Sequence, residues 1–220
     1  MEYENIPLNY QSYDWSCGLA ALCVALNEFN INTSEDKIKH LLAKKKAHLL
    51  DEGFLMSDTG LACQLYGLRT KFKIPGYTKS YMKIVGHTKK IRQEINDKMS
   101  MKLESDIRYR FESLLKYINN GGKVQCFANE WRPCYCDIHN ALKNGSVVIA
   151  EVDCVEYYDI KDEYWSHSIV LIPWKGQFKL FDPYRKRGQN DYDNWERHVE
   201  YSDKFDWQRW RGYLLELCRN

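Results

Sequence analysis

The strongest chemical signal in the chain is a cysteine at the expected start of a helix. Asp14 and Ser16 are residue types that cap helix N-termini, and apolar side chains then recur at helical spacing up to residue 29. Cys17 would therefore lie in the first turn, where backbone N–H groups and the helix dipole favour a thiolate over a thiol. Gly18 leaves space beside the sulfur for a substrate carbonyl. The pattern predicts a nucleophile for acyl carbon.

Such a nucleophile needs an oxyanion donor and a base. Gln11 lies six residues before Cys17, and its side-chain amide could bind the oxyanion together with the Cys17 backbone N–H. Among the six histidines, His167 differs from the others because it heads an apolar strand, residues 168–172. A strand would hold the ring rigidly at one end of a sheet, as a general base requires.

Hairpin register predicts a carboxylate beside that histidine. If Trp174 pairs with Gln177 across a two-residue turn, Asp182 lies diagonal to His167 on the same side of the sheet. Pro173 cannot donate to the ladder and could shift the register by one residue, which would turn Asp182 to the other face. The expected catalytic residues are Cys17, His167, Asp182 and Gln11.

Helices are expected mainly in the first half of the chain and strands mainly in the second. The predicted helices lie at 17–29, after Thr33 and Ser34, from Ser57 to Gly67, between Gly76 and Tyr117, and at 137–142. The predicted strands lie at 68–74, 123–128, 146–155, 165–173, 177–182 and 212–218. This order predicts an α+β fold in which the nucleophile helix packs on a C-terminal antiparallel sheet. We expect one domain, 1–220, with a basic helical insertion at about 76–136.

Composition excludes several classes of protein. The 220 residues carry 32 Lys plus Arg and 30 Asp plus Glu, a net charge of +2 that argues against a nucleic-acid partner. The longest uncharged run, 15–27, is too short to cross a membrane. Residues 76–110 have a net charge of +5, for which a solvated helix face is expected rather than a docking surface for an acidic partner. The N-terminus does not resemble a signal peptide, so we expect a cytoplasmic protein.

The eight cysteines are expected to be reduced thiols, because their scattered spacing suggests no disulfide framework. One cluster could supply four zinc ligands: Cys126, Cys134, Cys136 and His139. Its spacing departs from that of zinc fingers, and buried structural thiols are the favoured interpretation. The expected chemistry requires neither a metal nor another cofactor.

The order of four motifs along the chain resembles that of the papain-like cysteine peptidases. The motifs are Gln11, Cys17-Gly18-Leu19-Ala20, His167 ahead of Val170-Leu171, and Asp182-Pro183. Within that superfamily they are most similar to the bacteriocin-processing peptidases, which act on double-glycine leaders. The run from Trp15 to Ala20, the helix-and-strand unit 61–72 and the basic insertion also resemble the guanylyl-cyclase-domain-containing proteins.

This resemblance covers about residues 6–185. It implies a papain-like fold and a peptide or protein substrate, with Cys17 as nucleophile and His167 as general base and acid. It also implies that Asp182 orients His167 and that Gln11 contributes to the oxyanion hole. Ser16 stands where the leader peptidases tend to have an acidic residue, and the insertion is foreign to the minimal peptidase.

Three alternatives remain open at the level of sequence. A glutamine deamidase or an acyltransferase would use the same triad and the same acyl-enzyme. A binding module without catalysis would use the basic insertion as its contact surface. A nucleotide cyclase is disfavoured because the sequence has neither a glycine-rich phosphate loop nor a clear pair of metal-binding aspartates.

Overall fold

The computed structural model describes residues 16–43, 55–75, 86–127, 135–153, 166–174, 177–183, 196–199 and 210–219. The helices in these ranges are α1 (Cys17–Glu28), α2 (Glu35–Ala43), α3 (Met56–Leu65), α4 (Thr88–Met99), α5 (Ser105–Asn119) and α6 (Tyr135–Lys143). The strands are β1 (Arg69–Pro75), β2 (Gly86–His87), β3 (Lys123–Phe127), β4 (Val147–Asp153), β5 (Ser166–Trp174), β6 (Gln177–Phe181), β7 (Glu196–Val199) and β8 (Trp210–Cys218).

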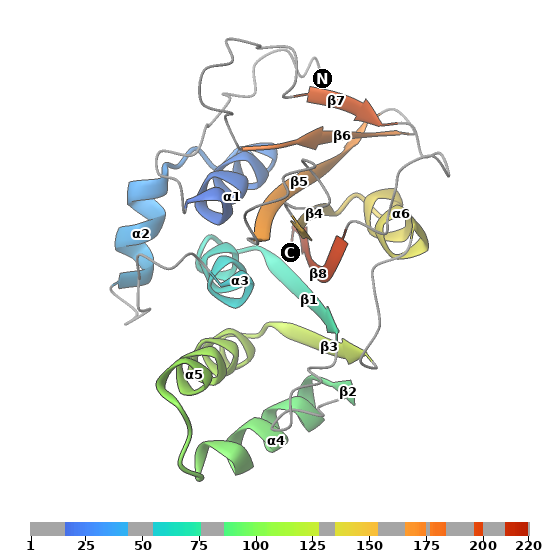
Figure 1. The fold of residues 1–220 in the computed structure, drawn as a ribbon. Coiled ribbons are helices and arrows are strands. Elements are labelled where there is room, and N and C mark those ends of the chain that lie inside the picture. Colours follow the sequence, from blue (N-terminus) through green and yellow to red (C-terminus); the bar gives the residue numbers. More distant parts are fainter. Residues whose placement is uncertain are drawn as a thin grey trace.

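The described strands form one mixed sheet, and the fold is of the α+β class. The strand order is β2-β3-β1-β8-β4-β5-β6-β7. All neighbouring pairs are antiparallel except β1 and β3, which run parallel. The C-terminal strand β8 lies between β1 and β4, so the sheet joins elements from both halves of the chain (Figure 1).

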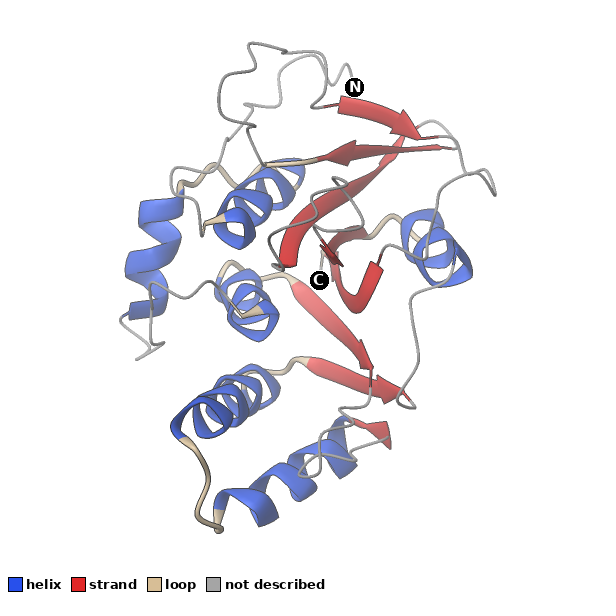
Figure 2. Cartoon of the chain, viewed as in Figure 1, coloured by secondary structure: helices blue, strands red, loops and turns tan. Residues whose placement is uncertain are grey.

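Helices cover both faces of this sheet. In Figure 1, α1, α2, α3 and α5 lie on one side of the sheet and α6 lies on the other, and Figure 2 shows the same layers coloured by type. Two apolar clusters fill the spaces between the layers. The larger joins α1 to α5 with one face of the sheet, and the smaller joins α6 with the other face.

Helix α1 is buried on nearly every side. Each residue from 18 to 26 is buried, including Leu19, Leu22 and Leu26. A helix that is apolar all round must be enclosed by its neighbours, and α1 packs against α2, α3, β4 and β5. Residues 17–27 of the uncharged run therefore belong to the central helix of the core. This enclosure fixes the position of its first residue, Cys17.

The predicted antiparallel sheet and the predicted separation of helices from strands are only partly correct. The strand expected at 68–74 lies inside the sheet, and β3 runs parallel to it. Parallel neighbours require a long crossover, and α4 with α5 provides one. Within the segment predicted as an insertion, at about 76–136, the described residues thus contribute β2 and β3 to the sheet. The two-residue β2 and the four-residue β7 were not predicted, because such short strands carry almost no periodic signal.

A buried polar cluster fastens this crossover to α3. The Asp58 carboxylate accepts a hydrogen bond from the Ser113 hydroxyl at 2.6 Å and another from the Tyr109 hydroxyl at 2.9 Å. Burial raises the pKa of Asp58, although these hydrogen bonds act in the opposite direction. A buried carboxylate needs such donors, so the cluster fixes α5 against α3.

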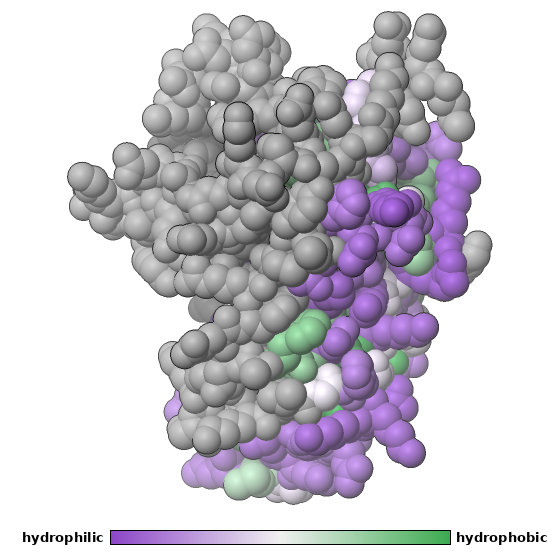
Figure 3. All heavy atoms as spheres, turned by 90° about the vertical axis from the view of Figure 1, so that its right-hand side faces the viewer, coloured by the Kyte–Doolittle hydropathy of each residue, from purple (hydrophilic) through white to green (hydrophobic). Residues whose placement is uncertain are grey.

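None of the helices described here is long and apolar enough to cross a membrane. On the face seen in Figure 3, the coloured side chains are mostly hydrophilic. Within the described ranges, Met101 is the large apolar side chain that is exposed, and it lies between α4 and α5.

Candidate active site

Cys17 is the first residue of α1, as predicted. Ser16 occupies the N-cap position, but its side chain makes no capping hydrogen bond to the helix. The first backbone bond of the helix runs from the Ala20 N–H to the Ser16 carbonyl oxygen. The N–H groups of Cys17, Gly18 and Leu19 therefore precede the helical hydrogen-bond ladder, at the positive end of the helix dipole.

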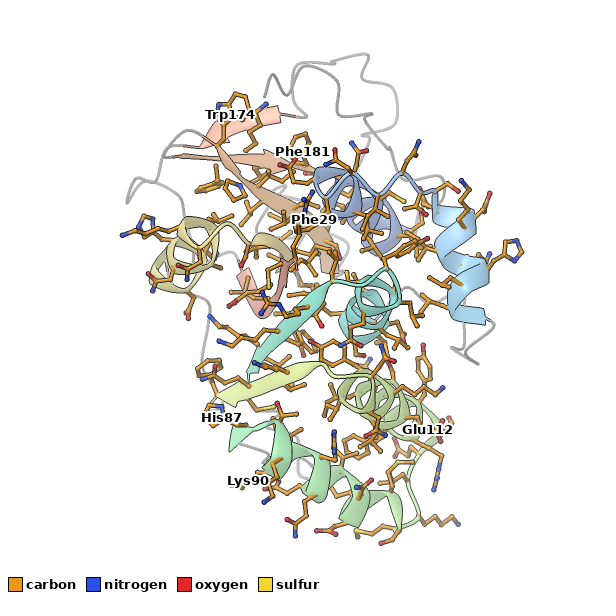
Figure 4. The ribbon with its side chains drawn as sticks, turned by 180° about the vertical axis from the view of Figure 1, so that it is seen from behind. Phe29, His87, Lys90, Glu112, Trp174 and Phe181 are labelled. Carbon is orange, nitrogen blue, oxygen red and sulfur yellow. The ribbon has the colours of Figure 1, made fainter. Side chains whose placement is uncertain are left out.

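The hairpin of β5 and β6 has the predicted register. Trp174 pairs with Gln177, and the ladder continues without a shift through Pro173 to the pair Val170 and Phe181. Pro173 therefore does not displace the register. Figure 4 shows Trp174 at one end of the hairpin and Phe181, the last residue of β6, at the end beside α1.

This register brings His167 and Asp182 together at the end of the hairpin near α1. The Nε2 atom of His167 lies 2.7 Å from Oδ1 of Asp182. The imidazole is fully buried, whereas the carboxylate is slightly exposed. A bond this short is typical of an imidazolium that donates to a carboxylate. Because Nε2 is bound to Asp182, the buried Nδ1 is the ring nitrogen that remains available to Cys17.

The electrostatics favour a protonated His167. Burial lowers the pKa of its ring, but the charge and hydrogen bond of Asp182, together with the interaction with Cys17, raise it by more. The net effect raises the pKa of His167 from 6.5 to about 9. The imidazolium is thus the dominant form of this side chain at neutral pH.

The same pairing favours an ionised Cys17. Burial raises the pKa of the thiol, but the hydrogen bond and the positive charge of His167 lower it by more, and the backbone of Ser168 adds a further hydrogen bond. The net pKa lies below the ordinary value of 9.0. Cys17 and His167 therefore each favour the charged form of the other, the direction of shift that a reactive cysteine requires.

Other described cysteines have the opposite electrostatics. Burial raises the pKa of Cys23 and of Cys126 to about 12, and it raises the pKa of Cys63 further still. These three thiols are free and buried, as expected for structural cysteines. Among the thiols of the described residues whose pKa is shifted, Cys17 is the one whose pKa is lowered.

Two sequence predictions fall on residues that the structure leaves undescribed. Gln11 lies outside the described residues, so its place in an oxyanion hole stays a prediction. The zinc interpretation stays a prediction as well, because Cys134 is also outside them. Within the ranges that are described, no group of three or more His, Cys, Asp or Glu side chains could hold a metal ion.

The sequence did not single out two residues that influence the pKa of Cys17. The backbone of Ser168 hydrogen-bonds to Cys17, and the negative charge of Glu151 raises the pKa of Cys17. Glu151 on β4 pairs directly with Ser168 on β5. Both residues could have been found from the pairing of β4 with β5. The hairpin predicted from the sequence comprises only β5 and β6, so it does not include that pairing.

Comparisons with protein-family models, with curated proteins and with solved structures give no match. The chemical role of the site is therefore inferred from its geometry and electrostatics.

Proposed function

We propose that the protein is a papain-like thiol hydrolase, a cysteine peptidase that cleaves a peptide or protein through an acyl-enzyme. The observation that carries the proposal is the hydrogen bond of 2.7 Å between the buried His167 and Asp182, together with the positive charge of His167, which lowers the pKa of Cys17. A nucleophile, a base and a group that orients the base, brought together in one site, are the recognisable signature of this chemistry. A thiolate enzyme needs a reducing environment, which fits the predicted cytoplasmic location.

The first half of the reaction forms a thioester. The Cys17 thiolate attacks the carbonyl carbon, a C–S bond forms, and the carbonyl oxygen becomes an oxyanion. The N–H groups at the start of α1, with Gln11 as the predicted second donor, would stabilise that charge. His167 then gives its proton to the leaving nitrogen, the C–N bond breaks, and the amine departs.

The second half restores the enzyme. His167, now neutral, accepts a proton from water as the water oxygen attacks the thioester carbon. The C–S bond breaks, the carboxylic acid product leaves, and the thiolate and imidazolium pair is restored. Asp182 keeps Nε2 occupied throughout, so that Nδ1 is directed toward the reacting atoms.

A mixed peptide library analysed by mass spectrometry tests this activity on many candidate sequences at once. We expect fragments with the wild-type protein and none with Cys17→Ala. The matched control is Cys218→Ala, which removes another partly exposed thiol, at the end of β8, and should leave cleavage unchanged. Conversion of glutamine to glutamate without cleavage, or transfer of an acyl group to an amine, would replace the peptidase by a deamidase or an acyltransferase. Equal products from wild type and Cys17→Ala would contradict the proposal.

A further inference from the structure

The surface of the sheet opposite α1 is only partly covered by the described helices. Among these helices, α6 is the one whose apolar side chains pack on that surface, and it lies over β4 and β5. On β1 and β3, Phe72, Ile74 and Val124 belong to the apolar cluster on the α1 side. Side chains alternate along a strand, so the residues between and beside these three project from the opposite surface.

Three cationic side chains project from that opposite surface: Arg69 and Lys71 on β1, and Lys123 on β3. Lys71 and Lys123 pair directly in register, and Arg69 lies two residues before Lys71 on the same strand. Arg69 and Lys123 are exposed, and Lys71 is half-buried. Neighbouring strands lie about 4.8 Å apart, and alternate residues of one strand lie about 6.6 Å apart. The three side chains therefore form a compact positive group, the basic strip.

The carboxylates beside the basic strip are bound to a different lysine. Glu216 on β8 pairs with Lys71 in register, but its Oε1 atom lies 2.7 Å from Nζ of Lys73. Oδ1 of Asp137 on α6 lies 3.3 Å from the same Nζ atom. Within the described part of the chain, no carboxylate forms an ion pair with Lys71 or Lys123. The charges of these two lysines are therefore not neutralised by Glu216 or Asp137.

Arg69 is held in place by a group that does not neutralise it. Its Nε and Nη2 atoms donate hydrogen bonds to the backbone carbonyl oxygen of Arg219, at 3.0 and 2.7 Å. A carbonyl group has no net charge, so the guanidinium is positioned but remains available to an anion. Like charges that face each other on neighbouring strands repel, which lowers stability. The basic strip thus combines a fixed cation with two lysines whose mutual repulsion an anion would relieve.

We propose that the basic strip is a docking surface for an acidic, extended segment of a partner protein. Carboxylates on alternate residues of an extended peptide recur about every 6.6 Å, which is the spacing of Arg69 and Lys71 along β1. A carboxylate at the second of these positions would also lie beside Lys123. This inference does not rest on the proposed function, because the strip projects from the surface of the sheet opposite α1 and its first residue, Cys17.

The size of the basic strip favours an acidic peptide over a nucleic acid. Proteins that bind a nucleic-acid backbone commonly make about 6–10 phosphate contacts, whereas the strip has three cations. The net charge of the whole chain, +2, also argues against a nucleic-acid partner. A short acidic segment needs only two or three carboxylates to occupy the strip, and its binding should weaken as salt screens the charges.

Fluorescence anisotropy with a rhodamine-labelled octapeptide that alternates glutamate and serine tests this inference on the full-length protein. At low salt we expect this peptide to bind, and we expect no binding of the same peptide with glutamine in place of glutamate. The double substitution Lys71→Gln and Lys123→Gln should weaken binding by roughly tenfold, as for the loss of two exposed ion pairs. Lys71→Arg with Lys123→Arg keeps both charges and should retain most of the affinity.

A matched double substitution separates the basic strip from overall charge. Lys37→Gln with Lys102→Gln removes two exposed lysines, one on α2 and one between α4 and α5, and should leave binding nearly unchanged. In the wild-type protein, amide NMR shifts on addition of the peptide should concentrate on β1 and β3, a readout that needs no variant. Equal losses in the two double variants, or shifts concentrated on other strands, would overturn the inference. Failure of the acidic peptide to bind, or tighter binding of an RNA octanucleotide through the same two lysines, would overturn it as well.

Discussion

At the scale of single residues, the surroundings of Cys17 lower the pKa of its thiol, whereas the surroundings of three other cysteines raise theirs. Cys23, Cys63 and Cys126 are buried with little to stabilise a charge, and burial raises the pKa of each. Cys17 is stabilised as a thiolate by His167, which is held in turn by Asp182. The pKa values differ because Cys17 lies at the start of a helix, beside the end of the hairpin of β5 and β6. The residue type is the same in all four cases.

Alkylation of the native protein should reflect this difference. Because only thiolates react rapidly, iodoacetamide at neutral pH should modify Cys17 well before Cys23, Cys63 or Cys126. Peptide mass spectrometry after timed quenching gives the rate at each site. The same sample in denaturant is the control, since all eight cysteines should then react alike. Slow modification of Cys17 in the folded protein would contradict the lowered pKa.

Asp182→Asn should shift the titration of His167 to lower pH. Loss of the carboxylate removes the largest contribution that raises the pKa of His167 to about 9, and we expect a decrease of roughly one to two units. NMR titration of isotope-labelled histidine measures it. An unchanged titration would show that Asp182 does not hold the imidazolium.

The same shift has a defined effect on stability. The folded-state pKa of His167 lies above 6.5, so its contribution to stability is complete below about pH 6.5 and is lost as the pH rises through about 9. The difference in unfolding free energy between wild type and Asp182→Asn should therefore decrease over that interval. A difference that grows with pH would have the wrong sign.

At the scale of elements, the sequence predicted local structure better than long-range pairing. The start of α1 and the register of β5 with β6 are confirmed, because both depend on residues close together in the chain. The parallel pairing of β1 with β3 was missed, since the whole segment 76–122 lies between these two strands and no local pattern specifies their register. The pairing of Glu151 with Ser168 was missed for a similar reason, because it joins β4 to β5.

Close packing of α3 against α5 offers a test at this scale. A Cβ on Gly60 would lie 2.6 Å from Cε2 of Tyr117, a fully buried side chain of α5. Gly60→Ala should therefore lower the free energy of unfolding by about 1–3 kcal/mol through overpacking. Urea denaturation measures this change. In a Tyr117→Leu background, where the clash is relieved, the same substitution should cost less. Equal costs in both backgrounds would contradict the packing described.

At the scale of the whole molecule, the end of the sheet that carries the candidate site depends on the C-terminal strand β8. The resemblance to papain-like peptidases covers about residues 6–185, yet β8 lies outside that range and separates β1 from β4. Strand β4 in turn supports β5, which carries His167. The chain beyond residue 185 is therefore part of the scaffold of the site.

Deletion of residues 210–220 should abolish both folding and rapid alkylation of Cys17. Without β8, β1 and β4 lose their common neighbour, and the apolar side chains Leu214, Leu215 and Leu217 are lost from the core. Circular dichroism during thermal unfolding, together with the alkylation rate, measures the effect. Deletion of Asn220 alone leaves β8 complete and is the control. A truncated protein that unfolds cooperatively and keeps a reactive Cys17 would contradict this dependence.

The most direct test of the proposed chemistry is capture of the acyl group on Cys17. With an active ester such as p-nitrophenyl acetate, we predict a rapid burst of p-nitrophenolate and an acetyl thioester on the peptide that contains Cys17. The burst should be absent in Cys17→Ala and much slower in His167→Ala. An equal rate of ester cleavage in wild type and Cys17→Ala, with no acetyl group on Cys17, would contradict the assignment of Cys17 as nucleophile.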